Sequence, residues 1–171
     1  MLKFTEVTRR ETLGTPSAPA LPVADSLEIK FDTRKRSRFR AVLVSGAECA
    51  VVVPRGTVLR DGDLLTDDTG ATSVRVRAAV ETLSQAVGND ALLLTRVAYH
   101  LGNRHVSLQI EPGQLTYLHD HVLDEMVRAL GLPVATVQAP FQPESGAYGG
   151  GHRHAGDEGH DHDHDHDHDH C

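Results

Sequence analysis

Histidines gather at the C-terminal end of the chain, where they alternate with aspartates. Residues 152–171 hold eight of the twelve histidines, and between residues 160 and 170 every even position is His and every odd position is Asp. Such a run has nothing apolar to bury, so it cannot build a core. Imidazole suits zinc, copper, iron and nickel, so this tail is predicted to collect metal. The candidate ligands are His152, His154, His160, His162, His164, His166, His168, His170 and the soft donor Cys171.

Three other interpretations of the tail compete with metal collection. Purification tags are usually uninterrupted His runs, whereas this run alternates with Asp and ends in Cys. An acidic tail that serves solubility would need only the aspartates. A pH sensor is the third, because a row of histidines charges at a pH of about 6 to 7. Metal collection is favoured, and it predicts that binding weakens as the imidazoles protonate.

Two histidine clusters lie in the part of the chain that should fold. The first is YHLGNRH at residues 99–105, where a predicted helix ends and a strand begins. His105 lies past the turn that follows this helix, where its side chain can project outward. A single exposed His is more often ordinary surface. His100 lies close to the apolar stripe of the helix, and we expect it to be structural.

The second cluster is His119-Asp120-His121, at the junction of a predicted strand and the next helix. In an extended backbone His119 and His121 point the same way, because side chains alternate along a strand. Two imidazoles with a carboxylate between them make a half-site for a divalent ion. Alternatively, Asp120 caps the helix through its side-chain oxygen. The two roles are compatible, and both stay open.

Length, charge and cysteine content limit the kind of protein. The 171 residues leave room for one or two small domains, and the net charge of −7 comes largely from the tail. The rest carries 16 basic and 17 acidic residues, so no nucleic-acid partner is expected. The basic run 34–40 is expected to be a solvated strand face or turn. No segment is long and apolar enough for a membrane span or a leader.

The two cysteines indicate a reducing compartment. Cys49 lies within a predicted buried strand and Cys171 ends the tail, so a structural disulfide is not expected. Apolar neighbours should leave Cys49 an inert thiol with a raised pKa. The chain is therefore predicted to be cytoplasmic.

The first part of the chain has the pattern of a small β domain. Short strands are predicted at residues 2–7, 26–31, 39–44, 48–53 and 64–65, separated by turn residues. Residues 72–87 have a strand-like pattern. Helices are predicted at 91–101, capped by Asn89-Asp90 and ended by Gly102, and at 121–130, ended by Gly131 and Pro133. Strands at 106–110, 115–118 and 134–138 complete a β-α-β-β-α-β order.

The sequence therefore predicts an α+β chain in three parts. A small N-terminal β domain covers residues 1–70, and a ferredoxin-like βαββαβ domain covers residues 71–140. A disordered, flexible His/Asp-rich tail covers residues 141–171. No nucleophile elbow, phosphate loop, dinucleotide fingerprint or HExxH motif is present, so we do not expect an enzyme.

Several motifs resemble the UreE family of urease accessory nickel metallochaperones. They are YHLGNRH at 99–105, LTYLHDHVLDEM at 115–126, APFQPESGAY at 139–148, PRG at 54–56 and LRDGD at 59–63. The likeness runs from about residue 2 into the tail, so the chain is identified as a member of that family. The resemblance implies a homodimer in which the β domain binds peptides or partners and the ferredoxin-like domain binds metal.

The resemblance also implies roles for particular residues. His105 from both protomers would form a nickel site at the dimer interface, and His119, Asp120 and His121 would add further metal sites. The tail histidines would add capacity and complete the shared site. Nickel would be the cargo, with zinc or copper able to bind, and the partners would be the urease accessory GTPase and the urease apoprotein complex. The alternative is a cytosolic protein that stores or buffers nickel or zinc.

Overall fold

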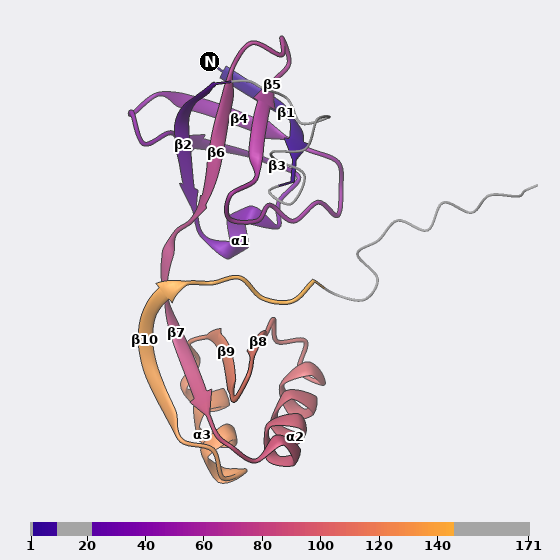
Figure 1. The fold of residues 1–171 in the computed structure, drawn as a ribbon, viewed down its shortest axis with the longest axis vertical. Helices are drawn as coiled ribbons and strands as arrows, with labels where there is room; N and C mark the ends of the chain where they lie inside the picture. The colour runs from indigo at the N-terminus through magenta and orange to yellow at the C-terminus, as the bar shows by residue number, and fades with distance from the viewer. Residues whose placement is uncertain (1, 10–21, 146–171) are drawn as a thin grey trace, which may run out of the picture.

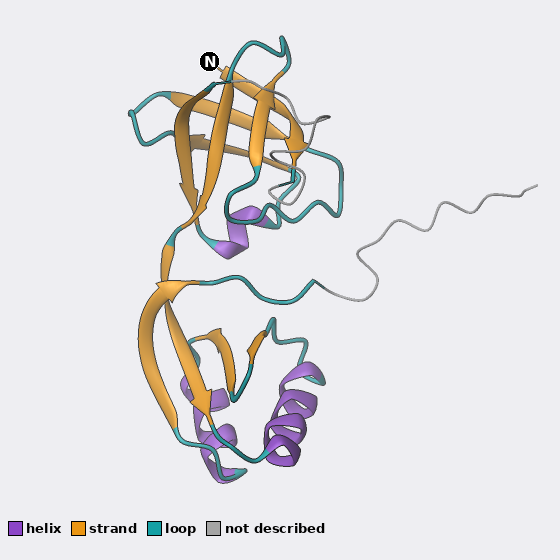
Figure 2. Cartoon of the chain, in the orientation of Figure 1, coloured by secondary structure: helices purple, strands orange, loops and turns teal. Residues whose placement is uncertain are grey.

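The computed structural model describes residues 2–9 and 22–145, which form two β-sheets and three helices (Figure 1). One sheet lies in the N-terminal part of the chain, and the second sheet lies with two longer helices in the C-terminal part (Figure 2). The predicted α+β fold class is therefore confirmed. The tail from residue 146 onward lies outside the described residues.

The first sheet has six strands in the order β2-β6-β5-β1-β4-β3. The strands are β1 (Leu2–Thr8), β2 (Val23–Ile29), β3 (Arg38–Val42), β4 (Glu48–Val52), β5 (Leu64–Asp67) and β6 (Ser73–Ala78). Alternation along β4 shows how the core forms, because Cys49 and Val51 are fully buried while Glu48 is exposed. The sheet curls around this core in Figure 2. The predicted burial of Cys49 is confirmed.

A short helix takes the place of the end of one predicted strand. The strand expected over residues 26–31 stops at Ile29, and α1 (Phe31–Arg34) follows. The carboxylate of Glu81 accepts a hydrogen bond of 2.7 Å from the N–H of Phe31 at the start of α1. That partner lies 50 residues further along the chain, so local sequence gave no sign of the helix.

The second sheet has four strands in the order β10-β7-β9-β8. Its strands are β7 (Val80–Val87), β8 (Gln109–Glu111), β9 (Gln114–Leu118) and β10 (Val134–Pro140). With α2 (Ala91–Gly102) and α3 (His121–Ala129), the chain order is β-α-β-β-α-β. This is the split βαβ arrangement of ferredoxin-like domains, as predicted.

Both helices pack on one face of the second sheet. Val97 and Leu101 of α2 are four residues apart, so they lie on the same side of the helix. They share one buried cluster with Val127 of α3 and with Ala86 and Tyr117 of the sheet. This apolar cluster fixes where each helix begins and ends relative to the sheet, and therefore where the flanking histidines lie.

One residue, Ala79, separates strands that belong to different sheets. β6 pairs with β2 and β5, whereas β7 pairs with β9 and β10. The continuous strand expected over residues 72–87 is therefore two strands. A domain boundary after residue 70, as expected from the sequence, would cut β6 from its own sheet. Ala79 alone separates β6 from β7, and Figure 1 shows these two strands following one another from the first sheet into the second.

A third apolar cluster lies between the two domains. Its buried members are Phe31 from the first domain and Leu83 and Phe141 from the second. The rings of Phe31 and Phe141 meet edge to face, with centroids 5.2 Å apart and planes at 80°. Aromatic pairs prefer this geometry, and such a pair adds about 0.5–1.5 kcal/mol beyond the apolar area it buries.

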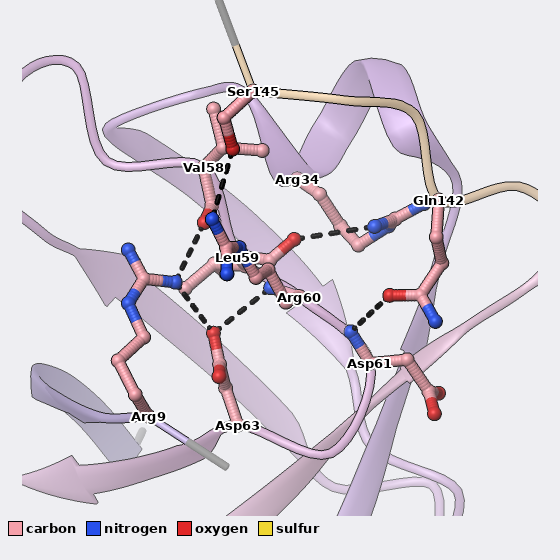
Figure 3. Close-up of polar contacts among 9 residues, drawn as sticks. All are labelled: Arg9, Arg34, Val58, Leu59, Arg60, Asp61, Asp63, Gln142 and Ser145. Atoms are coloured by element: carbon pink, nitrogen blue, oxygen red, sulfur yellow. Dashed lines mark hydrogen bonds and ion pairs between the residues drawn. The ribbon is translucent and has the colours of Figure 1, made fainter. Parts of the chain in front are cut away.

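Arg34 lies beside this cluster and is only 1% exposed. Its guanidinium donates to the carbonyl of Leu59 at 3.2 Å (Figure 3). It also donates to the carbonyl of Phe141 across the domain junction. Burial lowers the pKa of Arg34, and the nearby acidic groups, Glu81 first, oppose that shift. Arg34 therefore differs from Arg36, Arg38 and Arg40, which are exposed as predicted for the basic run.

Residues 141–145, which we call the strap, bind both domains. The side chain of Gln142 accepts a hydrogen bond of 3.0 Å from the N–H of Asp61 in the first domain (Figure 3). The backbone N–H of Gln142 donates to the side-chain oxygen of Gln109 in the second domain at 2.9 Å. Phe141 is fully buried. The strap therefore belongs to the folded part, although the flexible tail was expected from residue 141.

Among residues 2–9 and 22–145, no helix is long and apolar enough to span a membrane.

The buried guanidinium generates a stability prediction. Arg34→Met removes the donors to two carbonyls on fully buried residues, so the free energy of unfolding should fall by about 1–3 kcal/mol. Urea unfolding measures this change. Arg36→Met is the matched control, since it removes an exposed guanidinium and should change stability by less than about 0.5 kcal/mol. Equal stability of the two variants would contradict the role assigned to Arg34.

Candidate metal-binding site

His105 follows helix α2, which begins at a side-chain cap. The carboxylate of Asp90 accepts hydrogen bonds from the N–H groups of Leu92 at 2.9 Å and Leu93 at 3.1 Å, as the Asn89-Asp90 pair predicted. The chain leaves the helix after Gly102 and turns at His105. His105 is exposed, so its imidazole is available to a ligand.

The backbone of His105 is held in the left-handed region. Its φ is 57°, the only positive φ of a non-glycine residue in the described part of the chain. This conformation costs an ordinary L-residue about 1–2 kcal/mol. Hydrogen bonds of the turn hold it, since His105 N–H donates to Gly102 at 2.9 Å and Val106 N–H donates to Leu101 at 3.2 Å. Gly102, expected to be the residue that stops α2, is itself the last helical residue.

Backbone strain of this kind collects at binding and catalytic sites, where the surroundings enforce it. Ordinary surface histidines lack this strain. The strained backbone therefore favours a functional role for His105 over that of an exposed histidine without a function. His100 contrasts with His105, because His100 lies within α2 and its ring meets Tyr99 edge to face at 5.5 Å.

Asp120 caps helix α3. Its Oδ1 accepts hydrogen bonds from the N–H groups of Val122 at 2.8 Å and Leu123 at 3.2 Å. Its backbone is extended, with φ −148° and ψ 119°. The capping interpretation of Asp120 is therefore confirmed. A metal role for this carboxylate stays a prediction, as does a shared site between His119 and the exposed His121.

The imidazole of His119 is oriented by residues from other elements. Its Nδ1 lies 2.9 Å from Oγ of Ser84 on β7 and 3.3 Å from Oδ2 of Asp124 on α3. The side chain is 38% exposed, so the ring touches the protein on one side and solvent on the other. Nδ1 is thus engaged, and among residues 2–9 and 22–145 no hydrogen bond uses Nε2.

The sequence-based predictions did not include the three buried polar side chains that lie behind His119. Ser84, Tyr117 and Asp124 are all buried, and the Tyr117 hydroxyl donates to Asp124 Oδ1 at 2.9 Å. Burial, and then the contact with Asp124, raises the pKa of Tyr117. One signal was available, because Asp124 precedes the buried Val127 by three residues. An acid at that spacing faces inward, where it needs a partner.

The candidate ligands do not form a complete site within the described chain. Among residues 2–9 and 22–145, no three His, Cys, Asp or Glu side chains are placed to hold one metal ion. A full coordination shell on His105 or His119 therefore needs ligands from beyond these residues. The predicted tail ligands lie outside the described residues, namely His152, His154, His160, His162, His164, His166, His168, His170 and Cys171.

Cys49 is not part of any such group. Burial raises the pKa of its thiol, with Asp25 adding to the shift and a backbone hydrogen bond from Ala41 opposing it. A thiol that stays protonated is a poor nucleophile and a poor metal ligand. The inert role predicted for Cys49 agrees with this environment.

Fold and site together define a class of protein. It is a two-domain α+β protein whose ferredoxin-like domain presents histidines at helix ends. Profiles of this class match nearly the whole chain: the UreE urease accessory protein N-terminal domain matches residues 4–79, and its C-terminal domain matches residues 81–170. The chain belongs to the UreE urease accessory protein family. The two matches also meet at the boundary at Ala79.

Individual relatives agree with this assignment. The urease accessory protein UreE of Alkalilimnicola ehrlichii is 55% identical over 139 residues, covering 81% of this chain and 85% of the relative. That of Dechloromonas aromatica is 52% identical over 138 residues, covering 78% of each chain. That of Teredinibacter turnerae is 52% identical over 136 residues, covering 80% and 88%. These names describe accessory proteins rather than enzymes, as predicted, and membership implies a role in urease maturation.

The left-handed turn generates a prediction with opposite signs at two positions. The His105→Gly variant should be more stable than the His105→Ala variant, with a free energy of unfolding about 1 kcal/mol higher. The reason is that only glycine adopts positive φ without strain. Urea unfolding of the metal-free variants measures the difference. At Asn103, where φ is −63°, the order should reverse, with the glycine variant less stable than the alanine variant. The same order at both positions would rule out strain at His105.

Proposed function

We propose that this chain is a metallochaperone that collects Ni(II) and delivers it for assembly of the urease active site. The observation that carries the proposal is the exposed His105, held in a strained backbone conformation directly after α2. Imidazole is a suitable ligand for nickel, and zinc and copper would compete for the same nitrogen atoms. Because copper is favoured by the general stability order, selectivity for nickel would come from geometry and metal supply.

A second copy of the chain would supply the missing ligand. Leu92 and Tyr99 of α2 are 60% and 66% exposed, and they lie seven residues apart on one face of the helix. Burial of these two side chains against a second copy would remove apolar surface from water and so stabilise a dimer. A homodimer formed near this face would bring two His105 side chains together. A site of two imidazoles binds metal loosely enough to release it, which is what delivery requires.

The tail would collect metal and complete the shared site. Its eight histidines and Cys171 are attached to the same chain, so their effective concentration at His105 is high even when each binds weakly. His119, Asp120 and His121 would provide secondary sites. Loss of the tail should therefore reduce the number of ions bound more than it reduces the tightest affinity.

Nickel titration by calorimetry tests the site. His105→Ala should abolish the tight phase of binding and leave the weak tail phase, because it removes the imidazole that each protomer contributes to the shared site. His100→Ala is the control, since it removes a neighbouring imidazole placed within α2. A chain that ends at Gly150 should keep the tight phase at lower capacity. A tight phase of nickel binding that is unchanged in His105→Ala would contradict the proposal.

Storage or buffering of nickel or zinc is the competing function, and the tail alone could perform it. Delivery requires partners, which we propose are the urease accessory GTPase and the urease apoprotein complex in the cytoplasm. The full chain loaded with nickel should associate with the GTPase and activate apo-urease, and His105→Ala should do neither. Nickel binding without either response would favour storage.

A further inference from the structure

The imidazole of His119 lies close to the carboxylate of Asp124 rather than to that of Asp120, its neighbour in sequence. The carboxylate of Asp120 is already used as a helix cap, because its Oδ1 accepts hydrogen bonds from two backbone N–H groups of α3. Asp124 lies one helical turn further on, with its side chain 3% exposed and Oδ2 3.3 Å from Nδ1 of His119. The histidine therefore contacts the acid five residues away rather than its neighbour.

The hydrogen bonds around Asp124 define which groups donate. The Tyr117 hydroxyl donates its single proton to Oδ1 at 2.9 Å. Oδ2 faces His119 and, at 3.7 Å, the guanidinium of Arg128. Oδ1 thus accepts a hydrogen bond, and Oδ2 lies beside a cationic group and the imidazole, where it is placed to accept.

This arrangement favours one of the two neutral tautomers of the imidazole. A bare Nδ1 would direct its lone pair at Oδ2, and two lone pairs at that distance repel each other. A protonated Nδ1 can instead donate to Ser84 Oγ, which lies 2.9 Å away, and it places its N–H beside the Asp124 carboxylate at 3.3 Å. A neutral imidazole with its proton on Nδ1 carries its free lone pair on Nε2. Within the described chain, no hydrogen bond uses Nε2 of His119.

We propose that Asp124 and Ser84 are positioning residues that hold His119 with Nδ1–H inward and Nε2 available as a metal ligand. The inference rests on the proposed metal-handling function and deepens it, since it names the ligand atom and the groups that prepare it. Histidines that bind metal usually donate their second ring N–H to a carboxylate or carbonyl, which fixes the tautomer and makes the ligand more basic.

The position of Ser84 connects this group to the fold. Ser84 is on β7, Tyr117 is on β9 and Asp124 is on α3, so three elements converge behind one imidazole. The backbone N–H of His119 also donates to Thr82 of β7 at 3.1 Å. The ring is therefore fixed in direction before any metal arrives, which lowers the entropic cost of binding.

Nitrogen-15 NMR of the metal-free full chain tests the first half of the inference. At about pH 8, where an ordinary imidazole is neutral, His119 should be the Nδ1–H tautomer. Asp124→Asn removes the charge and brings an amide donor, so the population of the Nε2–H tautomer should rise. A wild-type His119 already in the Nε2–H form, or a tautomer that Asp124→Asn leaves unchanged, overturns the inference.

Zinc titration followed at His119 itself tests the second half. Zinc is diamagnetic, so the Nε2 resonance reports occupancy of this ring in the presence of the tail. Asp124→Asn should raise the zinc concentration at half-occupancy by about 10–100-fold. Tyr117→Phe is the matched control: it removes the other hydrogen bond of the same buried carboxylate, so it should lower stability but leave tautomer and occupancy as in wild type.

The outcomes separate this inference from the proposed function. If the Nε2 resonance of His119 does not respond to zinc, or if Tyr117→Phe weakens zinc binding as much as Asp124→Asn, the inference fails, while delivery through His105 stands. If both halves hold but nickel is not transferred to apo-urease, the delivery function fails and the positioning role of Asp124 stands.

Discussion

The buried guanidinium of Arg34 determines how the two domains are joined. A cation removed from water is costly unless its surroundings compensate, and here the compensation comes from carbonyl groups of both domains and from three nearby acids. Because one of those carbonyls belongs to Phe141, the first domain is completed only when the strap is in place. Each domain has its own apolar core, and this contact joins them together with the apolar cluster that contains Phe31 and Phe141.

Strand β7 links that contact to the histidine site. Along four residues it supplies Glu81 to the start of α1, Leu83 to the cluster between the domains, and Ser84 to the imidazole of His119. Alternation along a strand sends neighbouring side chains to opposite faces, so Leu83 and Ser84 serve different sides of the sheet. A shift of this strand by one residue would disturb the domain junction and the histidine together. The strand is therefore constrained from both faces.

Sequence patterns predicted what depends on neighbouring residues. The caps Asp90 and Asp120, the burial of Cys49 and the β-α-β-β-α-β order all follow from local spacing, and all are present. Features that depend on distant partners were missed. Arg34 and Phe141 meet across 107 residues, and Ser84 meets His119 across 35, so no local pattern indicates either pair. The left-handed turn at His105 was missed because Gly102, the residue suited to it, is used inside the helix.

The strap also determines where the histidine-rich tail begins. Ser145, the last described residue, accepts a hydrogen bond of 2.9 Å from Arg60 of the first domain. The 26 residues that follow are thus tethered at the joint between the domains rather than at the far end of the ferredoxin-like domain. A chain of that length spans at most about 90 Å. The point at which the tail joins the folded part therefore lies beside both domains, so the attachment point favours neither domain over the other.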